Sequence, residues 1–159
     1  MSFLIKSDAA CPPFPPEPLV RNRADVLLDF ALEALRGGAE RVYIVLCDEE
    51  VVELAGTSAA SARELAGEIQ RHKRYRGSLR GIVSGWRGAV YYLHESGVDV
   101  SRVRTGRDSL IVVGDHDGLS REDEEFLRGR ALWVSIGPKP YLSWFCAAYM
   151  AARLRGILR

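Results

Sequence analysis

The sequence predicts an α/β domain with a mainly parallel β-sheet flanked by helices. Strand-like and helical apolar patterns alternate along the chain, and most of the strand-like runs are continuously apolar rather than alternating. Strands of that kind are buried on both faces, as in parallel sheets covered by helices. The chain has 159 residues, 47% of them hydrophobic, so we expect one core and a single domain over residues 1–159.

The first half of the chain contains two predicted strands and two predicted helices. The run FLIKS (residues 3–7) reads as a strand, and the following CPPFPPEPL excludes a helix or a central strand because of its prolines. From Ala24 the apolar spacing predicts a helix that stops at a Gly-Gly pair. RVYIVLC (41–47) predicts a buried strand, and residues 58–72 predict a second helix.

The second half contains three predicted strands and two predicted helices. AVYYLHE (89–95), SLIVVGD (109–115) and ALWVSIG (131–137) read as buried strands. Residues 120–128 predict a helix. The run LSWFCAAYMAARLRGIL (142–158) is apolar nearly all round, which predicts a helix buried against the sheet or against a partner.

Composition excludes several classes of protein. The formal charge is only +1, so no global field favours nucleic acid or membrane. No spanning apolar run or signal peptide is recognisable, so we expect a cytoplasmic protein without membrane contact. The three cysteines, Cys11, Cys47 and Cys146, lack metal-like spacing, so we expect neither a metal site nor a disulfide framework.

Polar loops follow three of the predicted strands: YYLHESG, VVGDHDG and WVSIGPKPY. In parallel sheets, ligands bind beyond the carboxyl ends of the strands, where such loops converge. Gly114 and Gly118 allow a ligand to approach the backbone, although a strand-to-helix turn alone also favours glycine and aspartate. Asp115 and His116 are candidates for proton transfer or substrate orientation.

The acids that follow have a structural explanation. Ser120 and Asp123 fit a capping box, and residues 122–125 place negative charge at the positive end of a helix. We therefore assign these acids to the helix start. His94, at the end of a neighbouring strand, is expected to hydrogen-bond a loop rather than to catalyse.

A basic segment without any acid extends from Ile69 to His94, with Tyr75 and Trp86 interleaved. Basic side chains neutralise phosphates and flat rings stack on unpaired bases, so the segment predicts an RNA-facing surface; a solvated helix end and loop is the alternative. The candidate RNA-binding residues are Arg71, Lys73, Arg74, Arg76, Arg80 and Arg87.

The motifs YYLHESGVDV, VVGDHDGLSREDEEFL and SIGPKPYLSWFC together resemble those of the archaeal tRNA pseudouridine N1-methyltransferases of the TrmY type, in the SPOUT superfamily. The resemblance covers most of the chain and is specific from Tyr91 onward. It implies a SPOUT fold with a C-terminal trefoil knot, S-adenosylmethionine (SAM) as cofactor and a homodimer formed through the C-terminal helix.

The resemblance also implies which residues hold the cofactor. Taken individually, these residues have alternative explanations. GPKP could be a rigid loop that follows the strand, and Cys146 could be a small hydrophobic residue buried in the core. By matching position, the cofactor-binding residues are Leu93, His94, Gly114, His116, Gly118, Ile136, Gly137, Pro138, Lys139, Pro140, Tyr141 and Cys146.

The resemblance implies methylation at N1 of a pseudouridine in tRNA. That nitrogen must lose its proton, so Asp115 is the catalytic candidate, as base or as hydrogen-bond orienter. The alternatives are another RNA position, such as a ribosomal pseudouridine, and an inactive RNA-binding dimer. The expected dimer-interface residues, whose alternative is ordinary core, are Trp144, Phe145, Tyr149 and Met150.

Overall fold

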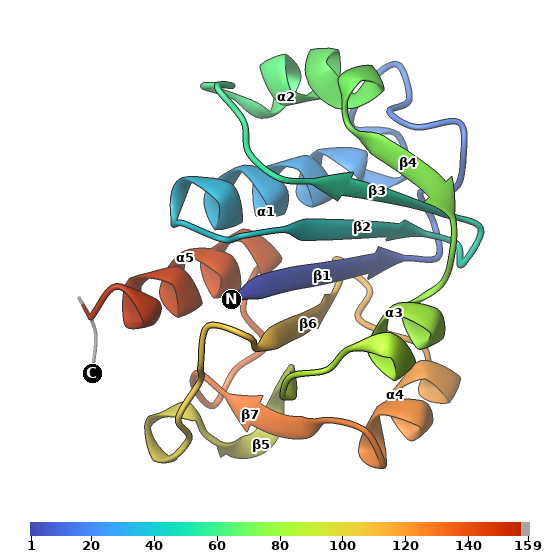
Figure 1. Cartoon of the computed structure of the whole chain (residues 1–159). Coiled ribbons are helices and arrows are strands. Elements are labelled where there is room, and N and C mark those ends of the chain that lie inside the picture. The colour runs from blue at the N-terminus through green and yellow to red at the C-terminus, as the bar shows by residue number, and fades with distance from the viewer. Residues whose placement is uncertain (157–159) are drawn as a thin grey trace.

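The computed structural model describes residues 1–156 and contains a seven-stranded mixed sheet with helices on both faces (Figure 1). The strand order is β4-β3-β2-β1-β6-β5-β7. The strands are β1 (Ser2–Ser7), β2 (Val42–Leu46), β3 (Glu50–Leu54), β4 (Lys73–Arg76), β5 (Val90–Asp99), β6 (Leu110–Gly114) and β7 (Leu132–Ser135).

The sheet is mainly parallel, as the continuously apolar strands predict. β1 pairs in parallel with β2 and β6, and β5 pairs in parallel with β6 and β7. β3 and β4 extend one edge in antiparallel fashion, and sequence analysis missed both strands. The β2–β3 turn is tight, with positive φ at Cys47 and Asp48, so β3 follows β2 without the glycine that usually marks a hairpin.

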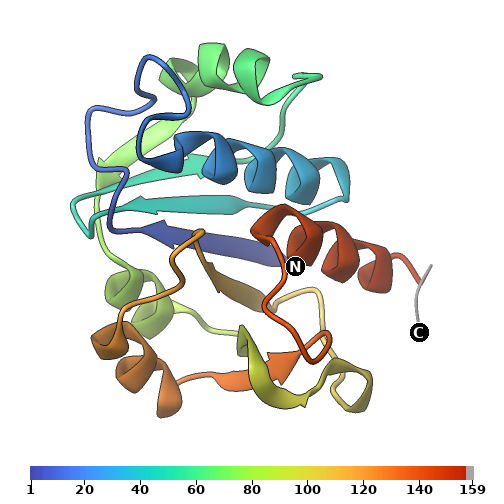
Figure 2. The ribbon, with the colours of Figure 1, turned by 180° about the vertical axis from the view of Figure 1, so that it is seen from behind.

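Helices cover the two faces of the sheet. α1 (Ala24–Arg36), α2 (Ala62–Glu68) and α5 (Ser143–Leu154) lie on one face (Figure 2), over a core that includes Phe3, Phe30 and Met150. The other face carries α3 (Leu79–Gly85), which sequence analysis also missed, and α4 (Arg121–Arg128), over Leu4 and Val112. Each face has its own buried cluster because alternate residues of the strands point to opposite sides.

The predicted helices differ from the structure mainly at their ends. The helix predicted over residues 58–72 is shorter, because Ser61 caps α2 by accepting a hydrogen bond from the Glu64 amide and residues 69–71 form a 3₁₀ turn. The last predicted helix is α5, and Ile157 and Leu158 of that prediction lie outside the described residues. Within residues 1–156, no helix combines the length and hydropathy needed to cross a membrane.

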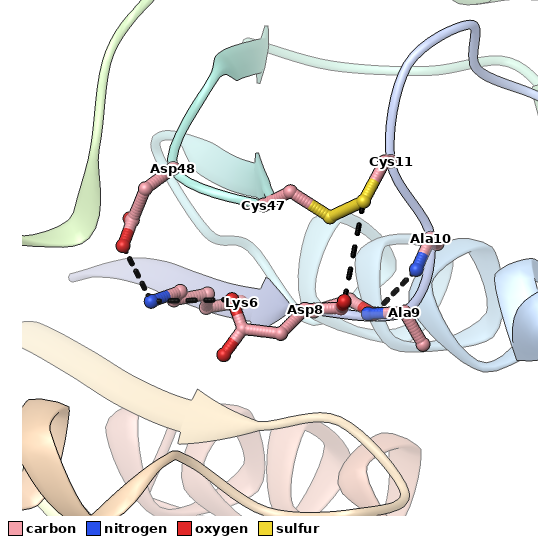
Figure 3. Close-up of a disulfide and its surroundings, with 8 residues drawn as sticks. Lys6, Asp8, Ala9, Ala10, Cys11, Cys47 and Asp48 are labelled. Carbon is pink, nitrogen blue, oxygen red and sulfur yellow. Dashed lines mark hydrogen bonds and ion pairs between the residues drawn. A yellow bond between two sulfur atoms is a disulfide. The ribbon is translucent and has the colours of Figure 1, made fainter.

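A disulfide joins Cys11 to Cys47, a pairing that the prediction of no disulfide framework did not include (Figure 3). The proline-rich segment returns along the carboxyl end of β1 to the β2–β3 turn, which brings the two Cα atoms to 5.2 Å. The separation of 36 residues gives no local spacing signal, because only the tertiary path of the segment makes the two thiols neighbours.

Candidate functional site

A cleft of about 660 Å³ lies at the carboxyl ends of the strands, where the three predicted loops converge. One wall is formed by residues of β5 and by residues at or after the ends of β6 and β7, and the other by the start of α1 and the first turn of α5. A cleft of this volume is in the range of small-molecule sites. The convergence of the three loops follows from the parallel order of β6, β5 and β7.

All the predicted cofactor residues line this cleft except Pro138, which is exposed beside it. His94 reaches the cleft because β5 loses its regular register against β7 between Leu93 and Val98. A Cβ on Gly97 in that irregular stretch would lie 2.5 Å from the Trp133 backbone, so the close approach of the two strands requires glycine.

The glycines of the other two loops are required by close packing. A Cβ on Gly114 would lie 2.5 Å from the carbonyl carbon of Gly118, and one on Gly137 would lie 2.2 Å from the Tyr141 hydroxyl oxygen. Gly118 also has a φ of +76°. Both loops therefore pack closely against their own neighbouring residues, and both line the cleft.

Asp115 is the most enclosed charged residue of the cleft, with 3% of its side chain exposed. Its amide donates to the Lys6 carbonyl at 3.2 Å, which fixes the end of β6 against β1. Its Oδ1 accepts from the Asp117 amide at 2.9 Å, and its Oδ2 lies 3.8 Å from Nδ1 of His116. The carboxylate is thus held in one orientation within the cleft.

The first turn of α5 is attached to the same loop. Ser143, which sequence analysis did not single out, donates from its hydroxyl to the Gly114 carbonyl at 3.0 Å. Cys146, one turn later, lines the cleft and is 8% exposed. Burial raises the pKa of its thiol to about 11, so at neutral pH it stays a protonated, apolar wall rather than a nucleophile.

Glu124, predicted only as an acid of the helix start, is a further residue of the site. Glu124 lines the cleft from α4 and accepts a hydrogen bond from the Tyr92 hydroxyl at 2.9 Å. Its carboxylate lies 3.5 Å from Nε2 of His94. The only sequence signal was its position one turn after Ser120, since residues so placed in a first helical turn lie beside the preceding loop.

The start of α1 contributes cleft residues that carried no motif. Arg23 lines the cleft with positive φ and pairs with Asp25 at 3.1 Å. Asp29, one turn into the helix, also faces the cleft, and its pKa is raised by burial and by the nearby charges of Asp25 and Glu33.

The basic segment is divided between the two ends of the sheet. β4 runs in the same direction as β2, so Arg76 lies at the carboxyl end, the end that holds the cleft, and Lys73 lies at the amino end. Arg80 follows Arg76 in the first turn of α3. Arg74 forms an ion pair with Glu50. The remaining predicted residues, Arg71 and Arg87, are exposed.

The aromatic residues of that segment have partners within the chain. The Tyr75 hydroxyl donates to Glu53, and burial together with that carboxylate raises its pKa to about 12. Trp86 donates from Nε1 to the Asp108 carbonyl at 2.8 Å and packs edge-on against Tyr43. Both rings are therefore held in the fold, and the exposed part of this surface is mainly its arginines.

An apolar patch covers the first turns of α5. Leu142 is 64% exposed, Trp144 42% and Phe145 38%. Met150, by contrast, is fully buried in the core of its own chain, so its expected place in a dimer interface is wrong: the side of α5 that carries it faces the sheet. Tyr149 is half-buried against Phe145.

Comparison with known proteins gives matches to one family. Residues 74–154 match the family described as SAM-dependent RNA methyltransferase. A protein from Pyrobaculum aerophilum named tRNA (pseudouridine(54)-N(1))-methyltransferase is 43% identical over 136 residues, which cover 86% of this chain and 98% of the relative. A relative of the same name from Thermococcus gammatolerans is 48% identical over 39% of this chain and 31% of its own length.

Solved structures share the fold at low sequence identity. Archaeoglobus fulgidus Nep1, bound to S-adenosylhomocysteine, has a TM-score of 0.64 and 19% identity, covering 86% of this chain and 73% of that one. The SpoU methyltransferase AviRb of Streptomyces viridochromogenes, in complex with SAM, has a TM-score of 0.61 and 16% identity over 100% of this chain and 59% of its own. The predicted SPOUT-type sheet and helices are thereby confirmed.

Proposed function

Because this chain belongs to the family of SAM-dependent RNA methyltransferases, we propose that it methylates N1 of a pseudouridine in tRNA. The observation that carries the proposal is the buried Asp115 carboxylate, which stands in a cleft lined by three strand-terminal loops. The name of the relative that is 43% identical over 86% of the chain supports the choice of substrate.

The residues of the cleft fit the cofactor. Leu93 and Ile136 supply apolar walls for the adenosine, beside the loops at Gly114 and Gly137. Pro140 stiffens the last loop, which lowers the ordering cost of binding. When bound, SAM supplies an activated methyl group on a sulfonium, a good leaving group.

The chain's own part in the reaction is positioning and proton acceptance. Asp115 would accept the proton of N1 on its carboxylate, which leaves the nitrogen lone pair available for the methyl group that bound SAM would supply. The hydrogen bond from the Asp117 amide fixes the carboxylate for this step. Orientation of the reactants within a closed site can lower the activation barrier by several kcal/mol, so the reaction does not require a covalent enzyme intermediate.

Replacement of the base tests this proposal. Asp115→Asn keeps the size and the hydrogen bond to the Asp117 amide but cannot accept the proton, so methyl transfer should fall by about 100-fold or more in a protein that still binds SAM. The measurements are mass spectrometry of nucleosides from tRNA treated with enzyme and isothermal titration with SAM. Asp108→Asn, in an exposed loop away from the cleft, is the matched control.

Two results would contradict the proposal. Near-normal methylation by Asp115→Asn would remove this residue from the mechanism. A methyl group found on a nucleotide other than pseudouridine, or on ribosomal RNA in place of tRNA, would reassign the substrate but leave the methyltransferase activity in place.

The proposal extends to the assembly and location of the protein. We propose that residues 1–159 form one domain, that its C-terminal segment is threaded as a trefoil knot, and that two copies pair through the α5 patch. The attachment of Ser143 to the Gly114 carbonyl and the exposure of Trp144 and Phe145 support the last two points. As a tRNA-modifying enzyme, the protein would act in the cytoplasm.

A further inference from the structure

The cleft carries an excess of negative charge in a chain whose formal charge is +1. Five carboxylates line it, against two permanent cations, Arg23 and Lys139. Arg23 is already paired with Asp25. The lining carboxylates are Asp29, Glu95, Asp115, Asp117 and Glu124.

Among these carboxylates, Glu124 of α4 contacts two cleft residues of another element, β5. The Tyr92 hydroxyl donates to it at 2.9 Å, and burial together with this contact raises the pKa of Tyr92, so the tyrosine remains the proton donor. Nδ1 of His94 accepts from the Ser96 amide at 3.1 Å, and its Nε2 lies 3.5 Å from the Glu124 carboxylate.

Glu124 thus joins two walls of the site. It extends from α4, while Tyr92 and His94 belong to β5, and all three residues line the cleft. Its side chain is 27% exposed, so the carboxylate is fixed by two partners and still faces the cleft. A charge held at the edge of a low-dielectric cleft acts more strongly than one in bulk water.

We propose that Glu124 favours binding of the positively charged SAM over that of its product, S-adenosylhomocysteine. This inference rests on the proposed cofactor site. Transfer of the methyl group converts the sulfonium to a neutral thioether, so the product has one positive charge less than the cofactor. A fixed carboxylate in the cleft therefore stabilises the cofactor more than the product, and it assists product release after each turnover.

Removal of this one charge tests the proposal by ligand affinity alone. In Glu124→Gln, which keeps the shape of the side chain, the SAM Kd should rise about tenfold and the S-adenosylhomocysteine Kd by less than about threefold, as measured by isothermal titration. Glu125→Gln is the matched control, since Glu125 is adjacent, 70% exposed and absent from the cleft lining. Tyr92→Phe removes the hydrogen bond but not the charge, so the ratio of the two Kd values should stay unchanged.

A second measurement needs no variant. In the wild-type protein, raising NaCl from about 50 to 500 mM should weaken SAM binding more than product binding, because salt screens the attraction. Equal changes for both ligands, in Glu124→Gln or with salt, would overturn the role of Glu124 and leave the proposed function standing. A wild-type protein that binds neither ligand would overturn the proposed function as well.

Discussion

Lys6 is the most enclosed cation of the sheet, with a side chain that is 4% exposed. Its ammonium pairs with Asp48 of the β2–β3 turn at 2.6 Å and with Asp8 at 3.3 Å (Figure 3). It also pairs with Asp123 of α4. Its carbonyl accepts the amide of Asp115. One residue of β1 therefore connects the core to the loop that carries the proposed base.

We predict that Lys6→Met lowers the free energy of unfolding by about 3–5 kcal/mol, because it leaves the buried Asp123 carboxylate without its partner. Urea denaturation at pH 8 measures this. Lys73→Met, at an exposed position of β4, is the control and should change stability by less than about 0.5 kcal/mol.

The pH dependence of the same pair has a defined sign. Burial lowers the pKa of Lys6, but hydrogen bonds to Asp123 and Asp48 outweigh it and raise the pKa above its ordinary value of 10.5. The stabilisation is therefore fully present below pH 10.5 and is lost as the pH rises through the raised folded value. The difference in the free energy of unfolding between wild type and Lys6→Met should therefore become smaller as the pH rises through this range. A difference that stays constant would contradict a charged Lys6.

For individual residues, the sequence predicts positions in loops better than it predicts contacts between residues that are far apart along the chain. Gly114, Asp115 and His116 stand in one motif, so their place at a strand end is readable from the chain alone. Glu124 reads equally well as a helix-start acid, because the first turn of α4 does satisfy that role, and nothing local shows that Tyr92 lies opposite. The predicted roles of the cofactor residues remain predictions.

Among the elements, the proline-rich segment has a measurable effect through its disulfide. In Cys11→Ala the free energy of unfolding should fall by roughly 2–4 kcal/mol, because the unfolded chain is no longer restricted by a disulfide between residues that are 36 positions apart. Urea denaturation with and without dithiothreitol measures this. The reductant should lower the free energy of unfolding of the wild type by a similar amount and leave that of the variant unchanged. An equal decrease in both proteins would show that the reductant does not act through this disulfide.

The basic segment yields a second prediction at this scale, concerning β4 and α3. Arg76→Gln and Arg80→Gln, at the cleft end of the sheet, should each weaken tRNA binding and reduce the slope of log Kd against log salt by about 1. Lys73→Gln, at the other end of β4, is the matched control. An equal loss of tRNA affinity in all three variants would show that the tRNA-binding surface is not confined to the cleft end of the sheet.

The strands that the sequence predicts are those with continuous apolar runs. β1, β2, β5 and β6 contain continuous apolar runs, whereas β3 and β4 carry Glu50, Glu53, Lys73 and Arg76 at an edge, so their patterns look like loop. α3 is missed for a similar reason. It is only seven residues long and contains two glycines, a composition that disfavours a helix until tertiary packing of Leu79 and Val83 stabilises it.

At the scale of the whole molecule, the exposed patch on α5 predicts the assembly state. Light scattering should give the mass of a dimer at micromolar concentration, and Trp144→Glu should shift it to that of a monomer, because a charge in an apolar interface is strongly unfavourable. Val20→Glu, at another exposed apolar residue, is the control and should leave the dimer intact. A monomeric wild type would refute the proposed pairing.

The class of fold was predictable because parallel strands and their covering helices leave a strong pattern along the chain. The trefoil knot is a different kind of property: threading depends on the path of the whole backbone and has no periodicity in the sequence. It stays a prediction, which an experimental structure of the complete chain would test.

The central position of β1 bears on how the protein is made. On one side β1 meets β2 soon after synthesis, but on the other Ser2 must wait for Leu110, 108 residues further along (110 − 2). Until then the partly formed sheet has an exposed edge, at which the amides and carbonyls of β1 are unpaired. Exposed edges of this kind promote misassembly. Slow refolding and a need for chaperone protection during translation are the expected consequences of a middle strand that precedes both of its neighbours along the chain.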